Sequence, residues 1–296
     1  MKQPMKISPN YFTDHWNKLD LSDPSTNPED WEKAILIFED RIRGRFLDIV
    51  VRIQPETFSG FVVMAIDCLL IETLEQFYRG VPDSVGGSQS FFTHFFERSD
   101  RLKKEFAENH RKLFYEQFRC GILHQAEIKG DSLVRKVGPL VQNIGNGIIV
   151  NRQKFHEILV CEFNHYVQKL RDQNPIDVDL RLKFRTKMDY ICRNPQYYFA
   201  FRTDITHQVL QMHLGQVEIL GQATLKGWRV KKNKNGDCIG IASDNNSDIT
   251  GSVYRLSVEQ IDDLPKLNIE KDKRPIPVQV KCPDIPQHQL VWVYSR

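Results

Sequence analysis

Arg119 and His124 are the two residues of this chain whose types and spacing best suit catalysis. They enclose the segment Arg119-Cys-Gly-Ile-Leu-His124, which follows a run of helical character from His110 to Phe118. Histidine titrates near neutral pH and can transfer a proton, and arginine can hold a phosphate through a planar fork of donors. Together the two side chains could cleave RNA without a metal ion. An isolated Arg-x4-His pair also arises by chance. The surrounding sequence must therefore show whether this pair is catalytic or a chance occurrence.

Helical patterns flank this pair on both sides. The segment 59–78 is apolar almost all round, so we expect a central, buried helix there. Asp30 can cap the helix predicted before it, at residues 31–51. Several glycines follow His124 in the sequence. The predicted helices span residues 31–51, 59–78, 91–96, 101–118 and 151–172.

Carboxylates interrupt the apolar helix 59–78. Burying an unpaired carboxylate costs several kcal/mol, so we expect Asp67 or Glu72 to face a cation, with Arg119 as a suitable partner. Solvent exposure at the end of the helix is the alternative for Glu72. For Glu75 we expect exposure to solvent.

The passage Phe114-Tyr-Glu-Gln-Phe-Arg-Cys-Gly-Ile-Leu-His124-Gln, with the buried helix before it and the helix after it, resembles the HEPN superfamily. The resemblance covers roughly residues 30–172. It implies a homodimer whose Arg and His residues meet in a shared cleft, and a metal-independent endoribonuclease of the toxin or phage-defence type. Arg119 would bind the scissile phosphate and His124 would transfer the proton. The product would be a 2′,3′-cyclic phosphate, because the ribose 2′-hydroxyl is the nucleophile.

Cys120 departs from the family pattern, which usually has Asn, Asp or His after the arginine. A noncatalytic HEPN scaffold or interaction module is therefore the alternative, with Arg119 and His124 holding the helices together. In the catalytic reading Glu72, Asp67 and Cys120 would support the pair.

Composition restricts the remaining choices. With 296 residues, 41% of them hydrophobic, the chain is expected to form two domains. Its net charge of +3 neither indicates nor excludes RNA binding. The six cysteines form no Cys-x-x-Cys pair, so we expect no metal and no cofactor; Cys68 and Cys161 are expected to be buried. No apolar run reaches the roughly 18 residues of a membrane helix, and no secretory signal is visible. A cytoplasmic location fits best.

The composition changes near residue 195, where short β-rich runs begin. We expect an α+β fold made of an irregular arm (1–30), a helical domain (31–175), a basic connector (176–195) and a β-rich domain (196–296). The predicted strands span residues 216–221, 227–232, 238–242, 251–256, 278–281 and 290–294.

The β-rich region is similar to the gamma-glutamyl cyclotransferase family. The likeness rests on Tyr198-Phe-Ala-Phe-Arg-Thr-Asp-Ile205, on Gly221-Gln-Ala-Thr-Leu-Lys-Gly-Trp-Arg229 and on Ile249-Thr-Gly-Ser-Val-Tyr-Arg-Leu256. It implies a small β-barrel-like domain. Active members cradle their substrate in a Tyr-Gly-Ser-Asn loop and use a later glutamate as acid and base.

The corresponding cradle in this sequence is degenerate. It reads Phe201-Arg202-Thr203-Asp204, so a long cation replaces the glycine that allows close backbone approach. Asp204 places a negative charge where a γ-glutamyl carboxylate would bind.

The later glutamate is also replaced. Asn268 occupies its position and cannot transfer a proton, and Glu270 would face the other side of a strand. We therefore expect no cyclotransferase activity. The tail would instead bind a regulatory ligand, a protein partner or the helical domain; altered chemistry on an amine or amide is a further alternative.

Overall fold

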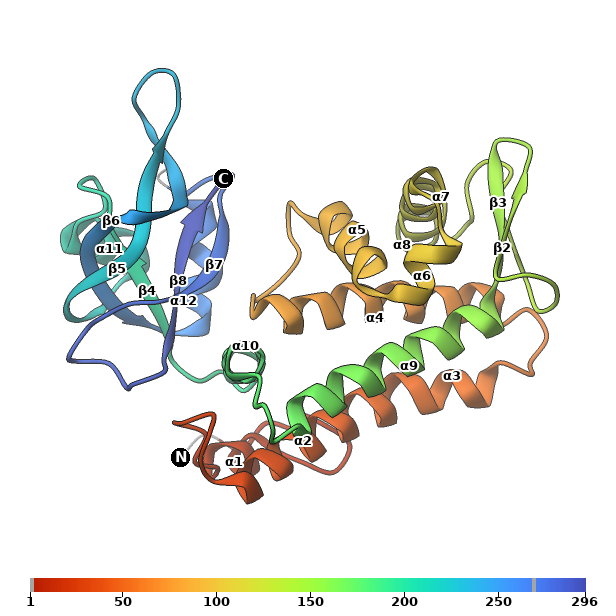
Figure 1. Cartoon of the computed structure of the whole chain (residues 1–296), viewed down its shortest axis with the longest axis horizontal. Helices are drawn as coiled ribbons and strands as arrows, with labels where there is room; N and C mark the ends of the chain where they lie inside the picture. Colours follow the sequence, from red (N-terminus) through yellow and green to blue (C-terminus); the bar gives the residue numbers. More distant parts are fainter. Residues whose placement is uncertain (1–2, 268–269) are drawn as a thin grey trace. The chain divides into compact units, whose positions relative to one another are not determined.

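The computed structural model describes residues 3–267 and 270–296 (Figure 1). The fold is α+β, with about 47% helix and two mixed sheets. The chain divides into two compact units, each described by itself. The first comprises Met1–Leu19, Trp31–Gln76 and Asp83–Asp177, and the second comprises Asp20–Asp30, Phe77–Pro82 and Val178–Arg296.

The first unit is mainly helical. Its helices are α1 (Thr13–Asn17), α2 (Pro28–Ile42), α3 (Asp48–Ile53), α4 (Gly60–Arg79), α5 (Ser88–Arg98), α6 (Asp100–Glu105), α7 (Glu108–Leu113), α8 (Cys120–Gln125) and α9 (Arg152–Arg171), with π-helical turns η1 (Arg43–Leu47) and η2 (Phe114–Arg119). A small sheet contains β1 (Leu133–Arg135), β2 (Val141–Ile144) and β3 (Gly147–Asn151), in the order β1-β3-β2. Strand β3 is parallel to β1 and antiparallel to β2.

Helix α9 runs alongside α2 because aromatic residues face each other along their length (Figure 1). The ring of Phe38 on α2 lies 5.6 Å from that of Phe163 and 5.7 Å from that of Tyr166, both on α9. Apolar positions repeat at helical spacing on both elements, so burying this shared face fixes the two helices together.

A second aromatic cluster holds the segment that carries the Arg-x4-His pair. Phe114, on η2, packs with ring centroids 5.2 Å from Phe118 and 4.9 Å from Phe155 on α9, and Phe96 of α5 joins the cluster. All four side chains are fully buried. The packing of Phe114 and Phe118 against the core sets the direction in which the next residue, Arg119, leaves the helix.

A buried acid–base pair connects α4 to α9. Asp67 Oδ1 lies 2.7 Å from His156 Nδ1, and both side chains are buried. Asp67 Oδ2 and His156 Nε2 have no hydrogen-bond partner among the described residues. Burial raises the pKa of Asp67 to about 6, and its contact with His156 offsets only part of that rise.

The second unit contains α10 (Val178–Ile191), β4 (Gln196–Ala200), α11 (His207–Leu214), β5 (Glu218–Lys232), β6 (Cys238–Leu256), α12 (Val258–Asp263), the 3₁₀ turn η3 (Leu264–Lys266), β7 (Arg274–Gln279) and β8 (Leu290–Ser295). Its sheet has the order β5-β6-β4-β8-β7. Strands β4 and β8 are parallel, and the other neighbours are antiparallel.

Both faces of this sheet are buried. On β4, Tyr198 and Ala200 belong to one hydrophobic cluster and Phe199 to the other, as the two-residue period of a strand requires. On β8, Trp292 belongs to the first cluster and Val293 to the second. Residues of α11 and α12 complete the first cluster, and the long hairpin β5–β6 supplies much of the second.

Helix α10 carries basic side chains that are buried within the second unit. Arg181 donates to the carbonyl oxygen of Pro24 at 2.6 Å, and Arg185 donates to that of Leu21 at 2.6 Å. Lys187 is buried as well. Neutral carbonyl groups therefore anchor the cations of the segment expected to be a basic connector, and this helix belongs to the second compact unit.

Several boundaries differ from those expected. The helix placed at 31–51 begins at Pro28 and is interrupted by η1, so Asp30 lies in the first turn and not at the cap. The predicted strands 216–221 and 227–232 belong to one strand, β5, and 238–242 and 251–256 belong to β6. Irregularities near Gly221 and Gly227 hid this continuity. Cys161 is exposed, in contrast to the expected burial. No helix of the described chain is long and apolar enough to cross a membrane.

The buried pair of Asp67 and His156 predicts how the stability of the fold changes with pH. Because the pKa of Asp67 in the folded protein (about 6) exceeds the ordinary aspartate pKa of 3.8, this group stabilises the fold at low pH and loses that contribution as pH rises through 6. Asp67→Asn removes the titration. We expect the variant to gain about 2 kcal/mol relative to the parent between pH 4 and pH 7, measured by urea unfolding.

The exposed carboxylate Asp48 on α3 provides the control. Asp48→Asn should leave a constant difference from the parent across the same pH range. Parallel stability profiles for Asp67→Asn and the parent would contradict the assigned titration.

Candidate functional site

Three elements of the first unit bring Glu72, Arg119 and His124 together. Glu72 comes from α4, Arg119 ends η2 and His124 lies near the end of α8. Arg119 Nε donates to Glu72 Oε1 at 2.7 Å, with the two side chains 17% and 12% exposed. The sequence expectation that Arg119 would be the cation facing one of the α4 carboxylates is met at Glu72.

Two serines hold the carboxylate of Glu72 in place. The hydroxyl of Ser88, at the start of α5, donates to Oε1 at 2.9 Å, and the hydroxyl of Ser84 donates to Oε2. With three donors, the carboxylate is fixed on both oxygens, and it in turn fixes the Nε edge of Arg119. The sequence does not point to either serine, because both lie between the predicted helices 59–78 and 91–96, where no periodic pattern indicates what they contact.

His124 accepts a hydrogen bond from Arg119. Arg119 Nη1 lies 3.2 Å from His124 Nε2. A guanidinium group can only donate, so this contact requires a lone pair on Nε2 and therefore a neutral ring. His124 is exposed. The arrangement places a solvent-accessible imidazole directly beside a fixed cation.

Arg119 keeps its charge in this setting. Burial lowers its pKa, but the hydrogen bond with Glu72 and the charge of that carboxylate outweigh burial, so the net pKa of Arg119 is raised. The guanidinium also lies 5.7 Å from the ring centroid of Tyr115. The cluster can bind an anion through Arg119 and accept a proton through His124.

Of the other two predicted supporting residues, one lies at the cluster and one does not. Cys120 directly follows Arg119 in the chain, and its side chain contributes to the raised pKa of that guanidinium. Asp67 instead pairs with His156. The expectation for Glu75 is wrong: it is fully buried and forms an ion pair with Arg98 of α5.

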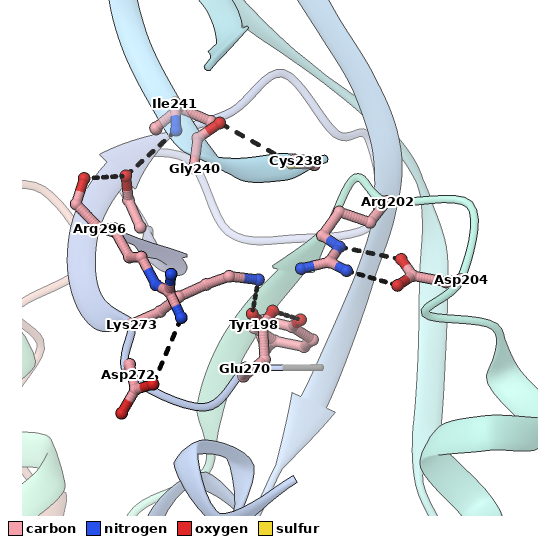
Figure 2. Close-up of polar contacts among 11 residues, drawn as sticks. Tyr198, Arg202, Asp204, Cys238, Gly240, Ile241, Glu270, Asp272, Lys273 and Arg296 are labelled. Carbon is pink, nitrogen blue, oxygen red and sulfur yellow. Dashed lines mark hydrogen bonds and ion pairs between the residues drawn. The ribbon is translucent and has the colours of Figure 1, made fainter. Parts of the chain in front are cut away.

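In the second unit, Arg202 and Asp204 of the expected cradle bind each other (Figure 2). Arg202 Nε donates to Asp204 Oδ1 at 2.9 Å, and a second hydrogen bond joins the guanidinium to Oδ2. The hydrogen bond from Arg202 lowers the pKa of Asp204. The two charges added to the loop after β4 therefore largely compensate each other.

The predicted position of Glu270 is wrong. It lies in a turn after η3 and not on a strand, and its side chain points into the core of the unit (Figure 2). Tyr198 donates to Glu270 Oε1 at 2.6 Å, and Lys273 Nζ donates to Oε2 at 2.8 Å. Burial raises the pKa of Glu270 although both donors oppose the rise. Asn268, the other residue expected here, lies outside the described residues.

The expected cradle residues do line a pocket. It has a volume of about 480 Å³, and its other side is formed by the end of the β5–β6 hairpin, including Val230, Lys232 and Cys238. The cradle contributes Phe201, Arg202, Thr203 and Asp204. In the described part of the chain, no three His, Cys, Asp or Glu side chains gather in a way that could hold a metal ion.

Comparison with known proteins adds little. No protein-family model matches the chain, and no curated protein matches it. Among solved structures, it is similar to the uncharacterized protein loc79017 from Homo sapiens, at 14% identity and a TM-score of 0.28, over 34% of this chain and 64% of that one. It is also similar to YkqA from Bacillus subtilis, at 21% identity and a TM-score of 0.29, over 37% of this chain and 44% of that one. The chain thus spans less than two thirds of either protein, and scores this low carry no argument about fold or function.

Proposed function

We propose that the protein is a metal-independent endoribonuclease of the HEPN type. The observation that carries the proposal is the Glu72–Arg119–His124 cluster, in which a fixed cation and a neutral, exposed imidazole are hydrogen-bonded to each other. These are the two functions that cleavage by an internal 2′-hydroxyl requires: charge stabilisation at the phosphate and proton transfer.

In the proposed reaction the scissile phosphate displaces His124 from Arg119. His124 then takes the proton of the ribose 2′-hydroxyl, and the 2′-oxygen attacks the phosphorus. The bond to the 5′-oxygen breaks, and an imidazolium returns a proton to that leaving oxygen. The products are a 2′,3′-cyclic phosphate and a 5′-hydroxyl end, so atoms and protons balance without a metal ion.

A homodimer would complete the site in this proposal. Exposed apolar side chains lie on or next to the elements that build the cluster: Leu69 one turn before Glu72, Val85 next to Ser84, and Leu123 next to His124. Their exposed fractions are 41%, 80% and 44%. Covering such residues with a second copy would remove them from water and bring two Arg–His pairs to one cleft.

A noncatalytic HEPN scaffold is the second candidate. It is favoured by the pairing of Arg119 with Glu72, which offsets the positive charge that a phosphate would need. In this reading the cluster ties α4, η2 and α8 together, and the protein acts as an interaction module.

For the second unit we propose a regulatory or ligand-sensing role on a degenerate, barrel-like cyclotransferase fold. The mutual pairing of Arg202 and Asp204 supports it, because a cradle lined by these side chains differs from an open backbone cradle for a γ-glutamyl group. A toxin or phage-defence role in the cytoplasm would fit a nuclease controlled in this way.

Nuclease activity is tested with purified protein and structured RNA in EDTA. We expect cleavage that leaves 2′,3′-cyclic phosphate ends, and a loss of 10²- to 10⁴-fold in His124→Ala, because proton transfer contributes about that much. His165→Ala, which changes an exposed histidine of α9, is the matched control and should keep full activity. The readout is gel analysis with end-group mapping.

Equal cleavage by the parent and His124→Ala would overturn the assigned base. Absence of cleavage by the dimeric protein on every RNA class tried would favour the scaffold.

Cyclotransferase activity is tested by release of 5-oxoproline from γ-glutamyl peptides. We expect none from the parent, because Arg202 and Asp204 occupy the loop that would hold the substrate. The double variant Arg202→Gly/Asp204→Asn reopens that loop and should gain binding of a γ-glutamyl peptide without turnover, as measured by calorimetry. Turnover by the parent protein would refute the assignment.

A further inference from the structure

A second polar site lies in the first unit, where the N-terminal ends of its two longest helices meet. Gly60 begins α4 and Arg152 begins α9, and both line one pocket of about 350 Å³. The segment leading out of β1 closes the pocket. In Figure 1 the first turns of α4 and α9 lie at the same end of the unit, beside the small sheet. We call this the α4/α9 pocket; its lining residues are Phe58, Gly60, Phe61, Val134, Arg135, Lys136 and Arg152.

The α4/α9 pocket is cationic and has no acidic residue in its lining. Arg135, Lys136 and Arg152 contribute to it, and none of the three forms an ion pair with a carboxylate among the described residues. Arg152 is only 5% exposed, and burial lowers its pKa because no negative charge compensates it. A buried cation without a counter-ion is costly, so a bound anion would relieve a cost that the fold already bears.

Neutral acceptors hold these cations in position. Arg152 Nη2 donates to the carbonyl oxygen of Gln54 and Lys136 Nζ to that of Pro55, each at 3.0 Å. Arg135 Nη2 donates to the side chain of Gln142 at 2.7 Å, while its buried Nε has no hydrogen-bond partner in the described chain. These hydrogen bonds orient the three cations without neutralising their charge. The buried Nε–H of Arg135 remains available to a ligand in the part of the chain that the structure describes.

The two helices add to the positive potential. Each is 20 residues long, and the start of a helix is the positive end of its dipole; at α9 the side chain of Asn151 already accepts a hydrogen bond from the N–H of Lys154. Because Gly60 has no side chain, the first turn of α4 can approach β1 and the start of α9 closely. A Cβ at this position would lie 3.0 Å from Val134 and 3.1 Å from Arg152. An anion in this pocket would meet two helix ends in addition to three side-chain charges.

Exposed aromatic rings border the cations. Phe58 is 95% exposed, and its φ of 63° is a left-handed conformation that a bulky residue rarely adopts. Phe61, the second residue of α4, is 41% exposed. Rings held in water beside phosphate-binding cations are the combination on which single-stranded nucleic acid stacks its bases.

We propose that the α4/α9 pocket binds a phosphate of single-stranded RNA, with the neighbouring bases stacked on Phe58 and Phe61. The choice of RNA rests on the proposed nuclease function. Gly60 and Glu72 are twelve residues apart on α4, so the pocket lies roughly 18 Å along the helix axis from the Arg119 cluster. The pocket is therefore a separate anchoring site that holds the strand several nucleotides from the cleaved bond.

The test uses a 5′-fluorescein-labelled, 2′-O-methyl single-stranded RNA, which cannot be cleaved because its 2′-hydroxyls are blocked. Fluorescence anisotropy measures its binding to the full-length protein over a range of salt concentrations. The variant Arg135→Gln/Lys136→Gln should bind at least about tenfold more weakly, and the magnitude of the slope of log K against log salt should decrease by about 0.7, for the one phosphate that is no longer neutralised. Phe58→Ala should weaken binding about 5- to 100-fold.

The matched control is Lys103→Gln/Lys104→Gln on α6, which removes the same charge from exposed positions. It should keep parental binding, and circular dichroism should show that all variants remain folded. Equal affinity of Arg135→Gln/Lys136→Gln and the control would overturn the proposal. So would failure of the parent to bind the RNA, or preferential binding of an acidic peptide or anionic vesicles through the same residues.

The two proposals fail separately. Pocket-dependent binding of the uncleavable RNA without cleavage of ordinary RNA would disprove the nuclease and leave the pocket intact. Cleavage that depends on His124, with binding insensitive to Arg135, Lys136 and Phe58, would do the reverse.

Discussion

The first unit depends on how one helix accommodates its own negative charges. Helix α4 is apolar on most of its surface, yet Asp67, Glu72 and Glu75 all point into the interior. Each has a cationic or titratable partner on a different element: His156 on α9, Arg119 on η2 and Arg98 on α5. Because an unpaired buried carboxylate would cost several kcal/mol, these three contacts restrict which elements can surround α4.

This constraint also positions the candidate site. Arg119 could point into solvent as arginines usually do, but Glu72 holds its Nε edge against α4 and leaves Nη1 facing His124. The same structural device, a buried charge fixed by its partners, recurs at Glu270 in the second unit, where Tyr198 and Lys273 are the donors. In both units the polar cluster is part of the packed core and at the same time lies close to residues that reach solvent.

The sequence predicted helices well where apolar residues repeat with one regular helical spacing. The apolar pattern of α4 and the stripe of α9 predicted both helices to within a residue or two, and the cost of burying a carboxylate pointed to an ion pair between Arg119 and an α4 residue. Glu75 was misjudged because helical spacing alone does not reveal that α5 packs over the end of α4 and brings Arg98 to it. Ser84 and Ser88 were missed for the same reason, since their role depends on where a loop returns.

Other errors came from irregular backbone. Strands β5 and β6 read as separate short runs because bulges shift the alternation of inward and outward side chains. Glu270 was assigned to a strand, but the chain turns there and reverses the expected direction of the side chain. Such events depend on long-range pairing, which a local pattern does not contain.

The π-helical turn η2 has a consequence for how this segment can vary. A π turn accommodates one residue more than an α-helix does over the same length. Deleting one residue between Phe114 and Phe118 would allow an ordinary α-helix to form over the same length, so the later side chains would keep their angular position about the helix axis. Deleting one residue from the ordinary α-helix α7 before it would instead rotate every later side chain by about 100° and turn Arg119 away from Glu72. The π turn thus marks the place where this segment can lose a residue and keep the angular phase of the Arg-x4-His pair, whereas the flanking α-helical residues cannot change in number without moving the site.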